Sequence, residues 1–394
     1  MCTPLYKILS SEYGSFRNGI VTLFKERILK KPSVLLDPMA ATAPLIPFIE
    51  MKGHTAYFND VIPLHYFINK AKTYRVFTDY QKKGYDWYFE QLLKCMTLLD
   101  GKVLVMSDNW IDDSILNGLV EAWHATEEYD EESAILLKAI IILCVRPFSS
   151  VTKSNNPTWL KFGGISSDKD LGDVIKDSLT KFDGYYRHYY LAHRIKEKGE
   201  CIFTHLNATE LHLPQKVDII LTSPPYCNRL DPIVQYGPEN YFLSALGYPS
   251  PDESLVTTTK VRDYKSVEED FEFLTANSEF ANRLLNKIKK SKNDDRSYYL
   301  KYYTRYFAKL FEVTIKVLDN LSPSGKMYIV TQDNIHRGNL IEIDTILREL
   351  LKQRGWRSRL IKRWNRHHLG LRNVSRKHAF VKPMHFEKLV VLYQ

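Results

Sequence analysis

The clearest hydrophobic pattern near the start of the chain is an apolar run, a polar turn and a second apolar run. Residues 33–36 predict a short strand, and the apolar stretch that follows closes at Gly53. Residues 55–58 predict a second strand, which ends at Asn59 and Asp60. This pattern is typical of a β-α-β unit with parallel strands.

Asp60 stands at the carboxyl end of the second predicted strand, the edge where an open α/β sheet places its ligand. An acidic side chain about twenty positions after the first turn can accept hydrogen bonds from both hydroxyls of a ribose. The alternative is that Asp60 only caps the following helix. This segment alone leaves both interpretations open.

Between residues 67 and 199 the pattern becomes helical and rich in aromatic residues, which predicts a helical insertion. Its most apolar run, Ala134 to Val145, is too short to span a bilayer and predicts a buried helix. We interpret the aromatic runs as packing; stacking on nucleic-acid bases is the alternative.

Strands and helices alternate again after residue 200, which predicts an open, mostly parallel α/β sheet. Strands are predicted at 201–205, 217–221, 326–330 and 387–393, and a turn at 322–325. The core domain would comprise residues 1–66, 200–246 and 297–394. Residues 247–296 would form a second insertion, a candidate target-recognition region.

The predicted strand at 217–221 runs directly into Ser223-Pro224-Pro225-Tyr226. Prolines have no N–H, and Pro224 drives Ser223 toward extended geometry, so the chain would leave the sheet as a stiff rim of acceptors. The Ser223 oxygen and the Pro224 carbonyl could hold a planar exocyclic amine while Tyr226 lies against its ring. The alternative is that the prolines only end a strand and Tyr226 fills the core.

Composition narrows the class of protein. A chain of 394 residues with 44% hydrophobic content can build one sizeable core with insertions. The net charge of +9 suits a polyanionic partner. The 5 cysteines show neither metal-ligand nor disulfide spacing, which predicts free thiols in a reducing compartment and no metal. The N-terminus shows no secretory signal, so we expect a cytoplasmic protein without a membrane segment.

The C-terminal segment is strongly basic. Between Leu350 and Phe386 the sequence has eleven Lys or Arg residues and no Asp or Glu. One-signed charge interleaved with Trp356 and Trp364 predicts contact with a nucleic-acid backbone; a solvated face is the alternative. The candidate nucleic-acid-binding residues are Arg363, Arg366, Arg372 and Arg376.

Three segments together, LLDP, YFNDVIP and DIILTSPPYCNRLD, resemble the amino-group DNA methyltransferases that use S-adenosylmethionine. Ser-Pro-Pro-Tyr is similar to the N4-cytosine branch of that family. The resemblance covers the predicted core and leaves both insertions unassigned. It implies a Rossmann-like sheet and methyl transfer to the N4 amine of a cytosine flipped out of DNA. It also implies a bacterial or archaeal, nucleoid-associated protein of a restriction-modification system, with a cognate restriction endonuclease as partner.

The same resemblance assigns roles by position. Asp60 would hold the ribose of the cofactor, and Asn207 with Ala208 would lie near its adenine. The full cofactor-binding set is Ser15, Phe16, Asp37, Pro38, Ala40, Thr42, Asp60, Asn207 and Ala208, and the catalytic set is Ser223, Pro224, Pro225 and Tyr226. Arg229 would contact nucleic acid, although a local salt bridge with Asp231 is the alternative.

One feature departs from the family pattern. The loop after Asp-Pro is usually glycine-rich, whereas residues 39–44 contain no glycine. An alanine held in the left-handed conformation costs about 1–2 kcal/mol. Two alternatives therefore stay open beside N4-cytosine methylation: methylation of adenine N6 or an RNA amine, and a nucleic-acid-binding relative that no longer holds the cofactor.

Overall fold

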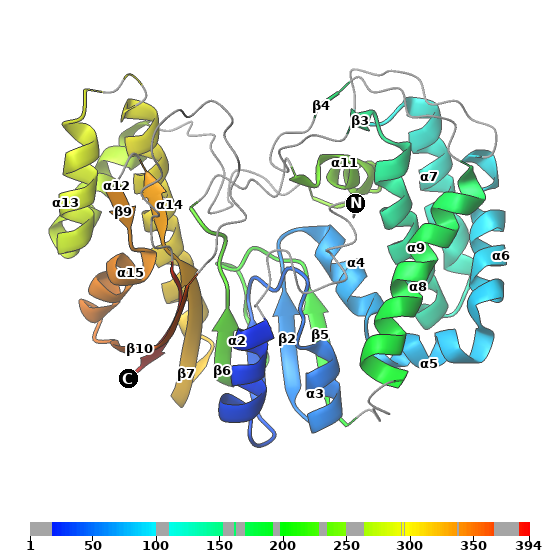
Figure 1. Cartoon of the computed structure of the whole chain (residues 1–394), viewed down its shortest axis with the longest axis horizontal. Helices are drawn as coiled ribbons and strands as arrows, with labels where there is room; N and C mark the ends of the chain where they lie inside the picture. The colour runs from blue at the N-terminus through cyan, green and yellow to red at the C-terminus, as the bar shows by residue number, and fades with distance from the viewer. Residues whose placement is uncertain are drawn as a thin grey trace. The chain divides into compact units, whose positions relative to one another are not determined.

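The computed structural model describes residues 18–99, 110–152, 161–162, 170–191, 198–227, 235–249, 264–292, 294, 296–336, 339–365 and 386–394 (Figure 1). By their contacts the residues form two compact units. The first is Met1–Leu206 with Pro232–Asp252, and the second is Asn207–Asp231 with Glu253–Gln394. This division does not test the predicted domain limits, which stay predictions.

The first unit contains three parallel strands, in the order β1 (Val34–Asp37), β2 (Thr55–Asn59) and β5 (Glu200–Thr204). Helix α3 (Ile46–Lys52) connects β1 to β2. Gly53 ends this helix with φ 75°, a left-handed conformation that glycine adopts without strain. The predicted β-α-β unit is confirmed, including Gly53 as the helix stop.

The other described residues of the first unit are mainly helical. The helices are α2 (Asn18–Leu23), η1 (Phe24–Ile28), α4 (Pro63–Ala71), α5 (Tyr74–Lys83), α6 (Tyr85–Cys95), η2 (Thr97–Leu99), α7 (Asp113–Ala125), η3 (Thr126–Glu128), α8 (Glu131–Val145), η4 (Arg146–Phe148), α9 (Leu171–Tyr186), η5 (Arg187–Leu191) and α11 (Gly237–Ala245). Strands β3 (Val151–Thr152) and β4 (Lys161–Phe162) form a small antiparallel pair.

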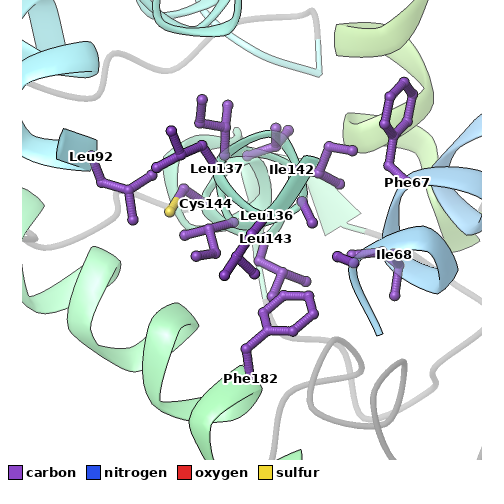
Figure 2. Close-up of a cluster of buried hydrophobic side chains, with 14 of the residues drawn as sticks. Phe67, Ile68, Leu92, Leu136, Leu137, Ile142, Leu143, Cys144 and Phe182 are labelled. Carbon is purple, nitrogen blue, oxygen red and sulfur yellow. The ribbon is translucent and has the colours of Figure 1, made fainter. Parts of the chain in front are cut away.

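Helix α8 is the centre of this helical part. It begins after Asp130, whose carboxylate accepts a hydrogen bond from Ser133 N at 3.0 Å. Phe67 of α4, Leu92 of α6 and Phe182 of α9 lie around it in one buried cluster (Figure 2). A helix that is apolar on every side must be enclosed by other elements. The buried helix predicted at 134–145 is thus confirmed.

The second unit contains four strands in the order β10 (Arg357–Asn365), β11 (Phe386–Tyr393), β7 (Leu321–Gln332) and β6 (Val217–Thr222). β6 and β7 are parallel, whereas β11 pairs antiparallel with both β7 and β10. Taken with the first unit, the pairing is mostly parallel, which confirms the predicted α/β class and is compatible with a Rossmann-like fold. β10 was not predicted, because its charged residues hid the strand pattern.

The turn predicted at 322–325 is wrong: these residues belong to β7. Val217 pairs with Leu321 but Ile219 pairs with Lys326, so residues 322–325 bulge opposite the single residue Asp218. A side chain at Gly325 would come within 2.7 Å of Leu321 and 3.0 Å of the Asp218 carbonyl oxygen. The Ser-Pro-Ser-Gly composition marks a β-bulge here, because glycine permits this close approach.

The helices of the second unit are α12 (Tyr264–Asn277), α13 (Glu279–Lys289), α14 (Arg296–Leu318) and α15 (Ile343–Lys352), and β8 (Asn334–His336) pairs with β9 (Asn339–Ile341). The described part of the predicted second insertion forms α12 and α13, which pack against α14 and α15. Among the described residues, no helix combines the length and apolarity needed to cross a membrane.

Candidate functional site

The loop after β1 is closed by side chains rather than by glycines. Asp37, the last residue of β1, is buried, and its Oδ1 accepts a hydrogen bond from Met39 N at 3.3 Å. Burial, with a smaller contribution from the charge of Asp60, raises the pKa of Asp37 well above its usual value. Ala40 N donates to the Asn59 carbonyl oxygen at 2.8 Å. The loop is therefore anchored to the end of β2.

Two alanines in this loop have the backbone conformation that glycine would normally supply. Ala41 has φ 44° and Ala43 has φ 38°, both in the left-handed region. Ala43 N donates to the Ala40 carbonyl oxygen at 2.8 Å, which closes a tight turn. The absence of glycine in this loop therefore imposes local strain, and strain of this kind gathers at ligand-binding sites.

Asp60 follows β2 directly and links three segments of the first unit. Its Oδ2 accepts from Ala41 N at 2.8 Å, and its Oδ1 accepts from Ile62 N at 3.0 Å. Oδ1 also lies 3.1 Å from Nδ1 of His65 on α4. The carboxylate therefore supports the start of α4, as the capping interpretation expects, and it also holds the loop after β1. Its contact with a ribose stays a prediction.

Asp60 is ionised despite its burial. Burial raises the pKa of Asp60, but the charge and hydrogen bond of His65 and the two backbone N–H groups together lower it below its usual value. A carboxylate has about four lone-pair positions, so two backbone donors and one imidazole leave room for a further donor.

Two residues of the first unit that the sequence did not indicate hold the loop from the side of α4. Asn69 Nδ2 donates to the Ala41 carbonyl oxygen at 2.7 Å, and Lys72 Nζ donates to the Thr42 carbonyl oxygen. Lys72 is 1% exposed, and burial lowers its pKa to about 7. Neither residue belongs to a recognisable motif, because their partners lie 28 and 30 positions away.

Asn59, the last residue of β2, was also missed as a functional candidate. Its Nδ2 donates to the carbonyl oxygens of Pro38 and Leu206, both at 3.0 Å. Its Oδ1 accepts from Thr204 Oγ1 at 2.8 Å and from Leu206 N at 3.0 Å. One amide therefore ties together the ends of β1, β2 and β5.

Some polar atoms beside this loop remain unpaired in the described part of the chain. Thr42 Oγ1 and His65 Nε2 are buried and have no hydrogen-bond partner there. Buried polar groups are nearly always paired, so such atoms suit a bound ligand. Thr42 follows Ala41, whose N–H binds Asp60, and His65 contacts the same carboxylate, so both unpaired atoms belong to residues beside the loop after β1.

In the second unit, the candidate cofactor residues Asn207 and Ala208 form a local turn. Asn207 Oδ1 accepts from Thr209 N at 3.1 Å and from Thr209 Oγ1 at 2.9 Å. Ala208 is 8% exposed. A cavity of about 380 Å³ near Thr209 and Lys216 lies at the amino end of β6, away from the Ser-Pro-Pro-Tyr segment.

Ser223-Pro224-Pro225-Tyr226 leaves β6 at its carboxyl end and is supported by two other elements. Tyr306 of α14 donates its hydroxyl to the Pro225 carbonyl oxygen at 2.8 Å. The Tyr226 hydroxyl lies 3.1 Å from Ser223 Oγ and donates to Glu387 Oε1 of β11 at 3.1 Å. Within the described residues the Pro224 carbonyl accepts no hydrogen bond. Ser223, Pro225 and Tyr226 are half-buried and Pro224 is buried. The stiff rim of acceptors and the catalytic role of this segment stay predictions.

Arg363 is the one described member of the predicted nucleic-acid-binding set. It is exposed on β10 and lies 4.1 Å above the Phe386 ring, while Lys362 lies 5.4 Å above the Trp364 ring. The residues that fall outside the described ranges are Ser15, Phe16, Arg229, Asp231, Arg366, Arg372 and Arg376.

An unpredicted acidic cluster in the second unit surrounds a lysine. Lys388 Nζ lies 2.9 Å from Asp333 Oδ1, 2.7 Å from Glu342 Oε1 and 2.9 Å from Asp344 Oδ1. The three carboxylates are close enough to one another to ligate a metal. The Lys388 ammonium occupies the shared position, however, and the carboxylates raise its pKa, so the cluster is a buried ion network.

Comparison of the chain with models of known protein families gave no match, and a search of curated proteins also gave none.

Proposed function

We propose that the chain is an S-adenosylmethionine-dependent methyltransferase that acts on the exocyclic N4 amine of a cytosine in DNA. The observation that carries this proposal is the rim at the end of β6. Ser223 is half-buried and the adjacent Pro224 is buried, and within the described residues the Pro224 carbonyl oxygen accepts no hydrogen bond. Two acceptors side by side, on a segment that prolines stiffen, match the two hydrogens of an amine.

The rim also suits the chemistry of an aromatic amine. The lone pair of such an amine is delocalised into the ring, so the nitrogen is a poor nucleophile. As the nitrogen becomes pyramidal, hydrogen-bond acceptors bind its two hydrogens more strongly. They therefore stabilise the transition state more than the ground state. Ser223 and Pro224 would do this with little movement, since they follow strand β6 directly and Tyr306 binds the next carbonyl, that of Pro225.

The first unit supports the cofactor part of the proposal. The cofactor would supply an electrophilic methyl group on its sulfonium sulfur. Asp60 would accept from one ribose hydroxyl, and Thr42 Oγ1 and His65 Nε2 would gain partners that the described residues do not give them. Asp37, Pro38 and Ala40 would form the wall of the site, because Asn59 fixes the chain there.

The position of β10 supports DNA as the substrate. Trp364 pairs with Glu387 on β11, so the carboxyl end of β10 lies at the same edge of the four strands as Tyr226. Three strand spacings of about 4.8 Å place Arg363 about 14 Å from the rim. This is about four base-pair steps along the axis of a DNA duplex, a distance at which a phosphate flanking a flipped base can be held.

The test is methyl transfer from tritiated S-adenosylmethionine to unmethylated bacterial DNA, followed by digestion and separation of the nucleosides. We expect label in N4-methyl-2'-deoxycytidine. Label in N6-methyl-2'-deoxyadenosine would show that the methylated base is adenine, with the same type of reaction at its amine. Calorimetric titration decides the remaining alternative, since a folded chain that binds DNA but no S-adenosylmethionine would be a binding protein without this activity.

A further inference from the structure

Ser223, Tyr226 and Glu387 form a chain of hydrogen bonds within the second unit. Ser223 Oγ lies 3.1 Å from the Tyr226 hydroxyl, which donates to Glu387 Oε1 at 3.1 Å. Glu387 is 2% exposed and belongs to β11, where it pairs with Gln332 on β7 and Trp364 on β10. A buried carboxylate two strands away from β6 is therefore connected to the serine of the rim.

The series of hydrogen bonds from Ser223 through Tyr226 to Glu387 has a defined direction. A phenol has one proton, and Tyr226 gives it to Glu387, since a carboxylate only accepts. In the contact between the two hydroxyls, Ser223 must then be the donor. With its proton used in this way, the Ser223 oxygen presents only lone pairs to any other group.

We propose that Glu387 is a positioning residue that makes Ser223 an obligate hydrogen-bond acceptor and thereby selects substrates with an amine at the reacting position. The inference rests on the proposed function and adds the chemical basis of its selectivity. Cytosine and adenine present N–H donors at this position, whereas thymine and guanine present a carbonyl oxygen. A carbonyl would meet lone pairs on Ser223 and Pro224 and would leave all of them unpaired, which sites of this kind reject strongly.

The experiment compares Glu387→Gln and Tyr226→Phe with wild type in methyl transfer to unmethylated bacterial DNA. In Glu387→Gln the amide N–H can donate to the Tyr226 oxygen, so that Tyr226 donates to Ser223 instead of accepting from it. The Ser223 proton is then free to point toward the substrate. Tyr226→Phe keeps the ring and its stacking surface but breaks the chain. We expect kcat to fall at least about tenfold in each variant with little change in KM for S-adenosylmethionine. The kcat of the double variant should be close to that of either single variant, because both substitutions break the same series of hydrogen bonds.

Glu342→Gln is the matched control. Glu342 is another acidic residue of the second unit that contacts β11, but its partner is Lys388 and not Tyr226. We expect this variant to keep the wild-type kcat. Thermal melting of all variants identifies any loss of activity that is only loss of fold.

The outcomes separate this inference from the proposed function. If wild type methylates DNA amines and both folded variants match its kcat, the inference is overturned and the proposed function stands. If wild type transfers no methyl groups, the proposed function fails and the substrate selection fails with it. The hydrogen-bond chain is then judged by the infrared band of Glu387, obtained as wild type minus Glu387→Gln. This band should shift in the Tyr226→Phe background, and an unshifted band would show that the chain does not form.

Discussion

The loop after β1 and the segment after β6 both bring polar groups to the carboxyl end of a parallel strand, but by opposite means. Around the first loop, the side chains of Asp60, Asn69 and Lys72 hold backbone N–H and carbonyl groups. In the second segment, prolines remove backbone donors, and side-chain hydroxyls carry the network. In the first region charged side chains bind the backbone directly, whereas in the second region hydroxyl groups lie between the segment and the buried Glu387 carboxylate.

Because of this difference, we expect the two regions to respond differently to pH and to the loss of a hydrogen-bond partner. Buried charges make a structure depend on pH and on every partner of the charge, because an unpaired buried charge is costly. A proline-stiffened rim has a backbone conformation that does not depend on protonation. We therefore expect changes in the first region to alter stability and cofactor binding, and changes in the second to alter turnover.

The largest effect is expected for Ser223→Ala. Removing one of the two acceptors withdraws a hydrogen bond that strengthens in the transition state, so methyl transfer should fall about 10²–10³-fold. Cofactor affinity and melting temperature should stay near wild type. A Ser223→Ala protein with full activity would show that the rim is only a strand end.

Asp60→Ala should weaken S-adenosylmethionine binding by roughly 1.5–3 kcal/mol, the range for hydrogen bonds to a charged group. It should also destabilise the first unit, because the Ala41 N–H loses its partner. Asp60→Asn separates the two effects, since the amide keeps one acceptor oxygen in place. The measurements are calorimetric titration and thermal melting; unchanged cofactor affinity in both folded variants would remove Asp60 from the site.

Lys72→Met should abolish a pH dependence of stability. The pKa of Lys72 is about 7 in the folded chain and about 10.4 when unfolded, so between these values the unfolded state binds the extra proton. The unfolding free energy of wild type relative to Lys72→Met should therefore rise by up to about 1.4 kcal/mol per pH unit from pH 7 to 10. Below pH 7 the difference should be flat. Urea denaturation at several pH values measures it, and a constant difference would place the ammonium in water.

The smallest effect is expected for Ala41→Gly, and it should be stabilising. The substitution relieves the strain of a left-handed alanine in the folded state, about 1–2 kcal/mol. Glycine also increases the conformational entropy of the unfolded chain, which opposes this gain, so the free energy of unfolding should rise by about 1 kcal/mol or less. Ala40→Gly is the control, because Ala40 lacks the positive φ and should lose stability. Equal melting temperatures for Ala41→Gly and Ala40→Gly would contradict the strained conformation.

Much of the fold was predictable because its signals are local. Strands β1, β2, β5 and β6 each end in polar residues after a short apolar run, and α8 is apolar around its whole circumference. β10 was missed because four of its nine residues are charged, as an edge strand permits, and the bulge at 322–325 has the composition of a turn.

The alternation of helices and strands and the polar residues at the strand ends can be read from the printed sequence. The side chains that bind these strand ends come from distant parts of the chain and depend on how the chain folds. Glu387 lies 161 positions from Tyr226, and Tyr306 lies 81 positions from Pro225. Hydrophobic periodicity extends over a few turns or strand residues, so it cannot indicate partners that only strand order and helix packing bring within hydrogen-bond distance.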